Sequence, residues 1–144
     1  MKSLLFCAGI LCCILSCSQD FKKLSDKEVD SVKVEIAQKF ATDYLTASKN
    51  GTYYQFTDEA IDVIKNQLTP ETQKAVYNQL RDEFGDFQTL EYAEIWIPSG
   101  DSSVNIVRFK SEFKRSNKKL EVRVVLNESD KIAGFWVRPW SDIL

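Results

Sequence analysis

The sequence predicts an α+β domain, in which N-terminal helices pack on one face of a curved four-stranded antiparallel sheet. Apolar residues recur at steps of three and four up to about Gly85, which is the period of helices. Beyond Gly85 they recur at every second residue, which is the period of strands. Short turn sequences separate these later segments, and short turns join neighbouring strands in antiparallel order.

Residues 1–16 are typical of a secretory signal, because a positive start at Lys2 precedes an apolar run over 4–15. That run is shorter than the roughly 20 residues of a membrane-spanning helix. Ile14-Leu15-Ser16-Cys17 then resembles the lipobox of bacterial lipoproteins, which are cleaved before the cysteine, here between Ser16 and Cys17. The resemblance implies that Cys17 is lipidated; the alternative is an ordinary signal followed by a chance cysteine.

The predicted organisation is a signal peptide over 1–16, lipidated Cys17 with a tether over 17–25, and one α+β domain over 26–144. The lipid at Cys17 would anchor the domain to a membrane at the bacterial cell envelope, on the extracytoplasmic side. Ser18 follows the cysteine where inner-membrane lipoproteins of enterobacteria have Asp. By that resemblance we expect the outer membrane.

Three helices are expected before Gly85. The first runs from about Asp26 to Lys49, because Ser25 and Glu28 have capping-box spacing and Gly51 can end it. Thr57 is expected to cap a short second helix, and Pro70 lies in the first turn of the third, which ends at Gly85. The four predicted strands are Thr89–Ile97, Ser103–Arg115, Lys119–Asn127 and Lys131–Pro139.

The composition excludes several chemistries. The sequence has no histidine, and its four cysteines all lie within residues 1–17. The mature domain therefore lacks the usual zinc ligands and the imidazole base of Ser-His-Asp and Cys-His nucleophiles. No glycine-rich phosphate loop is present. We expect no cofactor, no metal site and no catalytic residue of these kinds.

Basic residues are concentrated between Arg108 and Arg123, where seven stand against Glu112 and Glu121. We interpret this run as a solvated hairpin tip; the alternative is a contact with anionic lipid headgroups or glycans. Nucleic acid is not an expected partner, because the chain has a net charge of −2 and is expected outside the cytoplasm.

Tyrosine and tryptophan side chains are suited to a ligand pocket and equally to a core. In Trp136-x-Arg138-Pro139-Trp140, Arg138 between two tryptophans could form cation–π contacts in an exposed anion or sugar site, or the aromatic rings could cover the core. The candidate ligand contacts are Tyr44, Tyr53, Tyr92, Trp96, Trp136 and Arg138.

Four short motifs resemble the bacterial family known as domain of unknown function 3887, over roughly Val34 to Pro139. They are Gly51-x-Tyr53, Leu68-x-Pro70, Phe84-Gly85-x-Phe87 and Lys131-Ile132-x-Gly134-Phe135, the last followed by Pro139. The resemblance implies a cystatin-like, nuclear-transport-factor-like cone, whose bent sheet wraps a long helix around a pocket. It transfers no catalytic residue.

The predicted function is a non-enzymatic accessory module at the envelope, which binds a small amphipathic ligand or a partner protein. The alternative is a small isomerase- or dehydratase-like enzyme with an Asp or Glu base and a Tyr in a conical pocket. For that enzyme the candidate pairs are Glu91 or Glu94 with Tyr92, and Asp62 with Tyr53. Glu91 and Glu94 are expected on opposite faces of their strand, so they would form no dyad.

Overall fold

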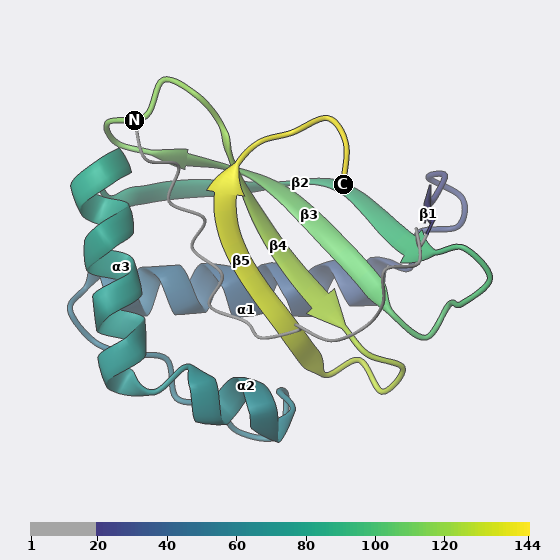
Figure 1. The fold of residues 1–144 in the computed structure, drawn as a ribbon, viewed down its shortest axis with the longest axis horizontal. Coiled ribbons are helices and arrows are strands. Elements are labelled where there is room, and N and C mark those ends of the chain that lie inside the picture. Colours follow the sequence, from purple (N-terminus) through teal and green to yellow (C-terminus); the bar gives the residue numbers. More distant parts are fainter. Residues whose placement is uncertain (1–19) are drawn as a thin grey trace.

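The computed structural model describes residues 20–144, so the predicted signal peptide and Cys17 lie outside the described residues. It is an α+β fold with helices packed against an open antiparallel sheet (Figure 1). The strands are β1 (Phe21–Lys23), β2 (Phe87–Pro98), β3 (Asn105–Phe113), β4 (Leu120–Leu126) and β5 (Ile132–Pro139). They lie side by side in chain order, each antiparallel to the next.

Helix α1 (Ser31–Lys49) lies across one face of this sheet, which we call the inner face, and contacts β2, β3 and β4 (Figure 1). The inner residues of the strands are apolar at alternate positions, as in Val122 and Val124 of β4, which are fully buried. Helix α2 (Asp62–Gln67) packs beside β5, and α3 (Pro70–Phe84) packs against α1. The predicted fold class is therefore confirmed.

Helix α1 begins five residues later than expected. Glu28 does accept a hydrogen bond from the Ser25 backbone N–H, at 2.9 Å, as a capping box requires. The chain forms only a turn there, and Asp30 caps the helix by accepting from the Val32 N–H. Ser25 and Asp30 are both strong cap formers, and the helix uses Asp30, which is the nearer of the two to its buried residues.

The second helix is also shorter than expected, because Thr57 bonds Glu59 instead of capping it. Ala60 pairs with Ile132 at the edge of β5, which holds this segment extended until Ile61. The third helix is as predicted: Pro70 lies in its first turn and Gly85 ends it at a φ of 83°. The structure adds that Thr69 caps it.

The sheet has five strands where four were expected. The additional strand, β1, comes from residues assigned to the tether, and Lys23 pairs with Trp96 of β2. The three residues of β1 are all exposed, so the sequence shows no alternation of apolar and polar residues that would predict a strand there. Its existence depends on the free edge that β2 offers.

Candidate functional site

The inner face, where a cone-shaped fold would hold a ligand, is filled by side chains. Five aromatic rings from α1, the following loop and β5 pack together with centroids 4.7–6.3 Å apart: Phe40, Tyr44, Tyr54, Phe56 and Phe135. Such tilted and edge-to-face pairs are typical of a well-packed core. This part of the interior is therefore core and not an open pocket.

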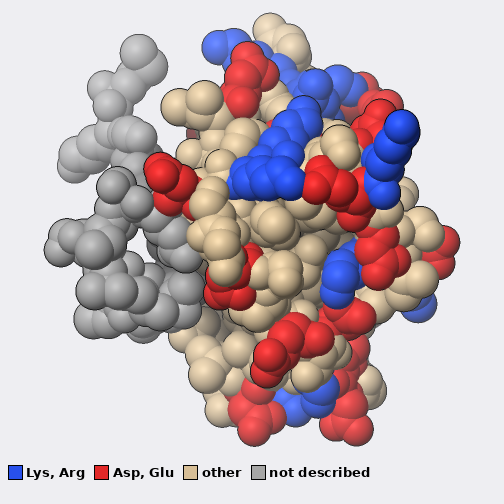
Figure 2. Space-filling view, turned by 90° about the vertical axis from the view of Figure 1, so that its right-hand side faces the viewer, with Lys and Arg blue, Asp and Glu red and all other residues tan. Residues whose placement is uncertain are grey.

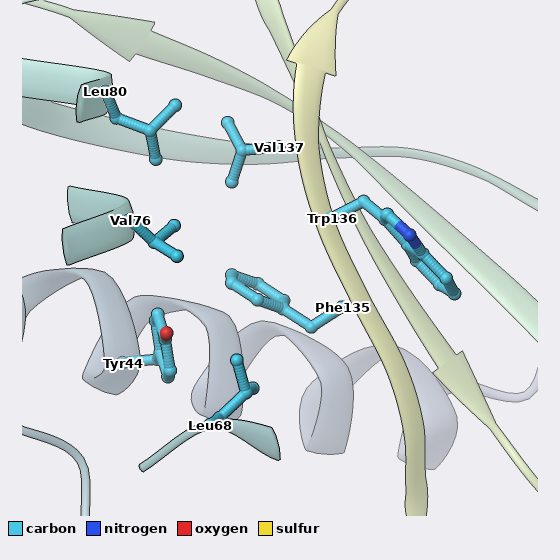
Figure 3. Close-up of a pocket in the computed structure, with 7 residues that line it drawn as sticks. All are labelled: Tyr44, Leu68, Val76, Leu80, Phe135, Trp136 and Val137. Carbon is cyan, nitrogen blue, oxygen red and sulfur yellow. The ribbon is translucent and has the colours of Figure 1, made fainter. Parts of the chain in front are cut away.

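A small cavity remains between α1, α3 and β5 (Figure 3). Its volume is about 20 Å³, which is room for about one water molecule. The Tyr44 hydroxyl group is buried there and has no hydrogen-bond partner within residues 20–144, and burial raises the pKa of this phenol. The other lining residues are Leu68, Val76, Leu80, Phe135, Trp136 and Val137, so no carboxylate base accompanies the tyrosine.

The opposite face of the sheet, which we call the outer face, carries an ordered array of charged and aromatic residues. Cross-strand pairing places Glu91, Lys110, Glu121 and Arg138 in one row across β2 to β5. The next row is Glu94, Arg108, Arg123 and Trp136, and Trp96 lies in the row after it. We call these residues, with Lys23 of β1 and Trp140 after β5, the outer-face cluster.

Arg108 lies at the centre of this cluster and its side chain is 0% exposed. It donates two parallel hydrogen bonds to Glu121, from Nε and Nη2, at 3.0 Å each. Its Nη1 pairs with Glu94, and Nη2 also donates to the carbonyl oxygen of Ser141. The Trp140 ring covers the guanidinium group at 4.4 Å. A buried arginine needs such complete pairing, because an unpaired buried charge is costly.

The two buried carboxylates remain ionised. Burial by itself would raise the pKa of Glu121, but hydrogen bonds from Arg108, Arg123 and Arg138 outweigh it and hold that pKa below its usual value. The pKa of Glu94 is likewise lowered, because hydrogen bonds from Lys23 and Trp96 and the charge of Arg108 outweigh burial. Glu94 and Glu121 therefore keep their negative charges at neutral pH.

Arg123 and Arg138 complete the cluster around Glu121. Arg123 donates from Nε to one carboxylate oxygen at 2.6 Å, and Arg138 donates from Nε to the other at 2.9 Å. The Arg123 side chain is 15% exposed and that of Arg138 is 43% exposed. Trp136 lies beside both, opposite Arg123 and two positions before Arg138. Its ring covers Gly134, where an added Cβ would come within 2.3 Å of it.

The structure separates the six predicted ligand contacts. Trp136 and Arg138 are neighbours on the outer face of β5, and Trp96 shares that face on β2, with β3 and β4 between them. In Figure 3, Trp136 points away from the cavity side of β5, while Phe135 and Val137 point toward the helices. Tyr44 and Tyr92 belong to the inner side, where Tyr92 packs edge-on against Phe109. Tyr53 is 47% exposed in the loop after α1.

Two details of the candidate pairs differ from expectation. A β-bulge between Tyr92 and Glu94 places Glu91 opposite Lys110 and Glu94 opposite Arg108, so both glutamates share the outer face. The expectation of opposite faces was wrong, because an extra residue inverts the alternation. Asp62 pairs with Lys65 on the surface of α2, where its side chain is 86% exposed, and Tyr53 is exposed as well.

The interpretation of the basic run as a solvated hairpin tip was wrong for Arg108, which is fully buried within the sheet, and for Arg123, whose side chain is only 15% exposed. The cation–π contacts considered for Arg138 are formed by other residues. Trp140 stacks on Arg108 and Lys110, and Arg138 instead pairs with Glu121. Arg108, Glu121 and Arg123 were missed as site residues; the one available signal was charged residues alternating with apolar ones in β3 and β4.

The face of the molecule that is turned toward the viewer in Figure 2 is mixed in charge. On the face that carries β1, basic and acidic side chains are interspersed, with acidic ones more numerous toward its lower edge (Figure 2). Within residues 20–144, no group of three potential ligands could hold a metal ion. No helix of that part of the chain has the length and apolar character needed to cross a bilayer.

The model of one family, described as Protein of unknown function (DUF3887), matches residues 37–135. That range includes α1 from its buried stripe onward, both other helices and β2 to the middle of β5. The chain belongs to this family. No curated protein and no solved structure matches the chain. Most of the outer-face cluster lies within the matched range, and Trp136, Arg138 and Trp140 follow directly after it.

Proposed function

We propose that this protein is a non-enzymatic accessory module of the bacterial cell envelope, anchored by lipid at Cys17, that binds a ligand or partner on the outer face of its sheet. The outer-face cluster supports this more than any other observation. It combines an ordered set of charges with three tryptophans, while the inner face is occupied by core side chains. Aromatic and arginine side chains are the residues that dominate binding sites energetically.

The spacing between anchor and sheet also favours a role at the membrane surface. Phe21, the first residue of β1, follows Cys17 by four positions, a span of at most about 14 Å. A lipid at Cys17 would therefore hold the β1 edge close to the bilayer, with Lys23 and the neighbouring cluster beside it. The lipobox resemblance supports this anchor, and Ser18 supports the outer membrane.

Native mass spectrometry of the full chain, purified gently from the membranes of its own host, tests both parts of the proposal. We expect a mature chain that begins at Cys17 and carries the mass of its acyl groups, and a Cys17→Ser variant without that mass. We also expect a bound molecule or partner protein that dissociates on denaturation. Trp136→Ala on the outer face should lose it, and Tyr44→Phe in the inner cavity should retain it.

Two results would contradict the proposal. Loss of the bound species in Tyr44→Phe, with retention in Trp136→Ala, would place binding in the interior. A chain that keeps residues 1–16 and carries no lipid would remove the anchor.

A further inference from the structure

The register of the outer face contains one position where the charge pattern is interrupted. Across the first row the signs alternate, from Glu91 through Lys110 and Glu121 to Arg138. In the second row Arg108 lies directly opposite Arg123, so two cations face each other. Like charges directly opposite in a sheet are destabilising. Positive charge is therefore in excess beside Arg123.

Glu121 accepts from Nε of Arg123 but has no capacity left for the other donors of this guanidinium. Glu121 accepts four hydrogen bonds, two from Arg108 and one each from Arg123 and Arg138, which uses the roughly four acceptor sites of a carboxylate. Nη2 of Arg123 is buried and has no partner within residues 20–144. Burial lowers the pKa of this guanidinium, as do the charges of Arg138 and Arg108. A buried donor without an acceptor is costly, and it leaves the charge of this guanidinium incompletely compensated. An anion at the exposed part of Arg123 would therefore be attracted.

We propose that Arg123, Arg138 and Trp136 form a binding site for an anionic saccharide, in which the two arginines take its carboxylate or phosphate group and Trp136 stacks on its ring. This inference rests on the proposed function, since it assigns a ligand class to the same outer face. Arginine forks match the geometry of carboxylates and phosphates, and a tryptophan ring offers an apolar platform next to them. The ligand's negative charge would offset the excess positive charge beside Arg123 and Arg138.

The depth of the site favours a soluble or polymeric sugar over a flat anionic bilayer. The Arg123 side chain is 15% exposed, and that of Arg138 is 43% exposed. A single slender anionic group can contact the small exposed part of Arg123 together with Arg138, whereas a planar layer of headgroups would meet only the more exposed cations.

The test is a ¹⁵N NMR titration of the mature lipidated chain in neutral detergent micelles, observing the arginine Nε–H and tryptophan indole signals. The probes are glucuronate, glucose phosphate, inorganic phosphate and neutral glucose, with phosphatidylglycerol vesicles as a separate arm. We expect glucuronate or glucose phosphate to shift the Arg123 and Trp136 signals, and to bind more tightly than inorganic phosphate. Glucose should bind more weakly than either charged sugar.

Arg138→Gln should weaken the binding of the charged sugar at least about tenfold, as expected for lost charge-assisted hydrogen bonds. Arg138→Lys, which keeps the charge but not the fork, should be intermediate. Lys119→Gln is the matched control: it removes the same charge from an exposed residue that pairs with Glu112, and it should bind like the wild type. Arg138 is half exposed, so these variants should fold.

Three results would overturn the inference: shifts that appear with vesicles alone, equal binding of glucose and glucuronate, or equal binding of inorganic phosphate and glucose phosphate. None of these results would change the outcome of the native mass spectrometry experiment, in which a partner co-purifies with the wild type and is lost in Trp136→Ala. The proposed function is therefore tested separately.

Discussion

Glu121 connects three arginines on a sheet face that would otherwise carry excess positive charge. It is 0% exposed, and it accepts the paired donors of Arg108 together with Nε of Arg123 and Arg138. A buried ion pair contributes little net stability compared with apolar residues, but removal of one partner leaves an uncompensated charge. Glu121 is therefore the residue on which the cluster's geometry depends most.

We predict that Glu121→Gln lowers the free energy of unfolding by about 3–5 kcal/mol, because Arg108 would remain buried without a counter-ion. The same change at Glu112, an exposed residue that pairs with Lys119, should cost less than about 1 kcal/mol. Urea unfolding monitored by circular dichroism measures both. Similar small losses in the two variants would show that the buried network is not required for folding.

At the scale of the element, α3 is fixed by a single buried side chain in its first turn. Gln73 is 1% exposed and makes three hydrogen bonds. Its amide accepts from the Tyr54 N–H at 2.8 Å and donates to the carbonyl oxygens of Tyr54 and Leu68 at 3.0 and 2.8 Å. One side chain thus joins the loop after α1, the end of α2 and the start of α3.

We predict that Gln73→Leu costs about 3 kcal/mol of unfolding free energy, because the buried backbone groups of Tyr54 and Leu68 would lose their partners. Gln38→Leu is the matched control, since Gln38 is exposed in α1 and the chemical change is identical. Urea unfolding of the two variants gives the comparison, and limited proteolysis should show faster cleavage near Tyr54 in Gln73→Leu alone. Equal stability would assign these hydrogen bonds no structural role.

At the scale of the whole molecule, the titratable groups make the protein sensitive to acid and insensitive to pH near neutrality. The sequence has no histidine, the side chain that ordinarily titrates between pH 5 and 8. The pKa values of Glu94 and Glu121 are held below the ordinary value of 4.5 by their cationic partners. A lowered pKa in the folded state means that stability is gained when the group ionises.

We predict a stability that is constant from about pH 8 to about pH 5.5 and falls as the pH drops below about 4.5. The sign follows from linkage: these carboxylates contribute fully above their unfolded pKa, and that contribution is lost as the pH falls through their lower folded pKa. Urea midpoints measured across this range provide the test. A transition between pH 6 and 8 would contradict it, since it would require a group with a strongly raised pKa.

Local signals in the sequence determined the boundaries of α3, the helix-to-strand order and the apolar inner face of β4. Each depends on residues that are neighbours in the chain: Thr69 and Pro70 at one helix end, Gly85 at the other, and alternation from Leu120 to Leu126. The absence of histidine, and with it the exclusion of imidazole chemistry, also required only the sequence. The start of α1 was placed too early because Ser25 and Asp30 are both able to cap a helix.

Only the tertiary structure decided where the charges lie. Arg108 and Glu121 are 13 positions apart and meet because β3 and β4 pair in one particular register. The bulge in β2 brings Glu94 to the same face, and the chain after β5 returns to place Trp140 over Arg108. Register and bulges are properties of a pair of strands, so the sequence of one strand alone does not determine them. For that reason no single segment could predict the outer-face cluster, although each of its residues was present in the sequence.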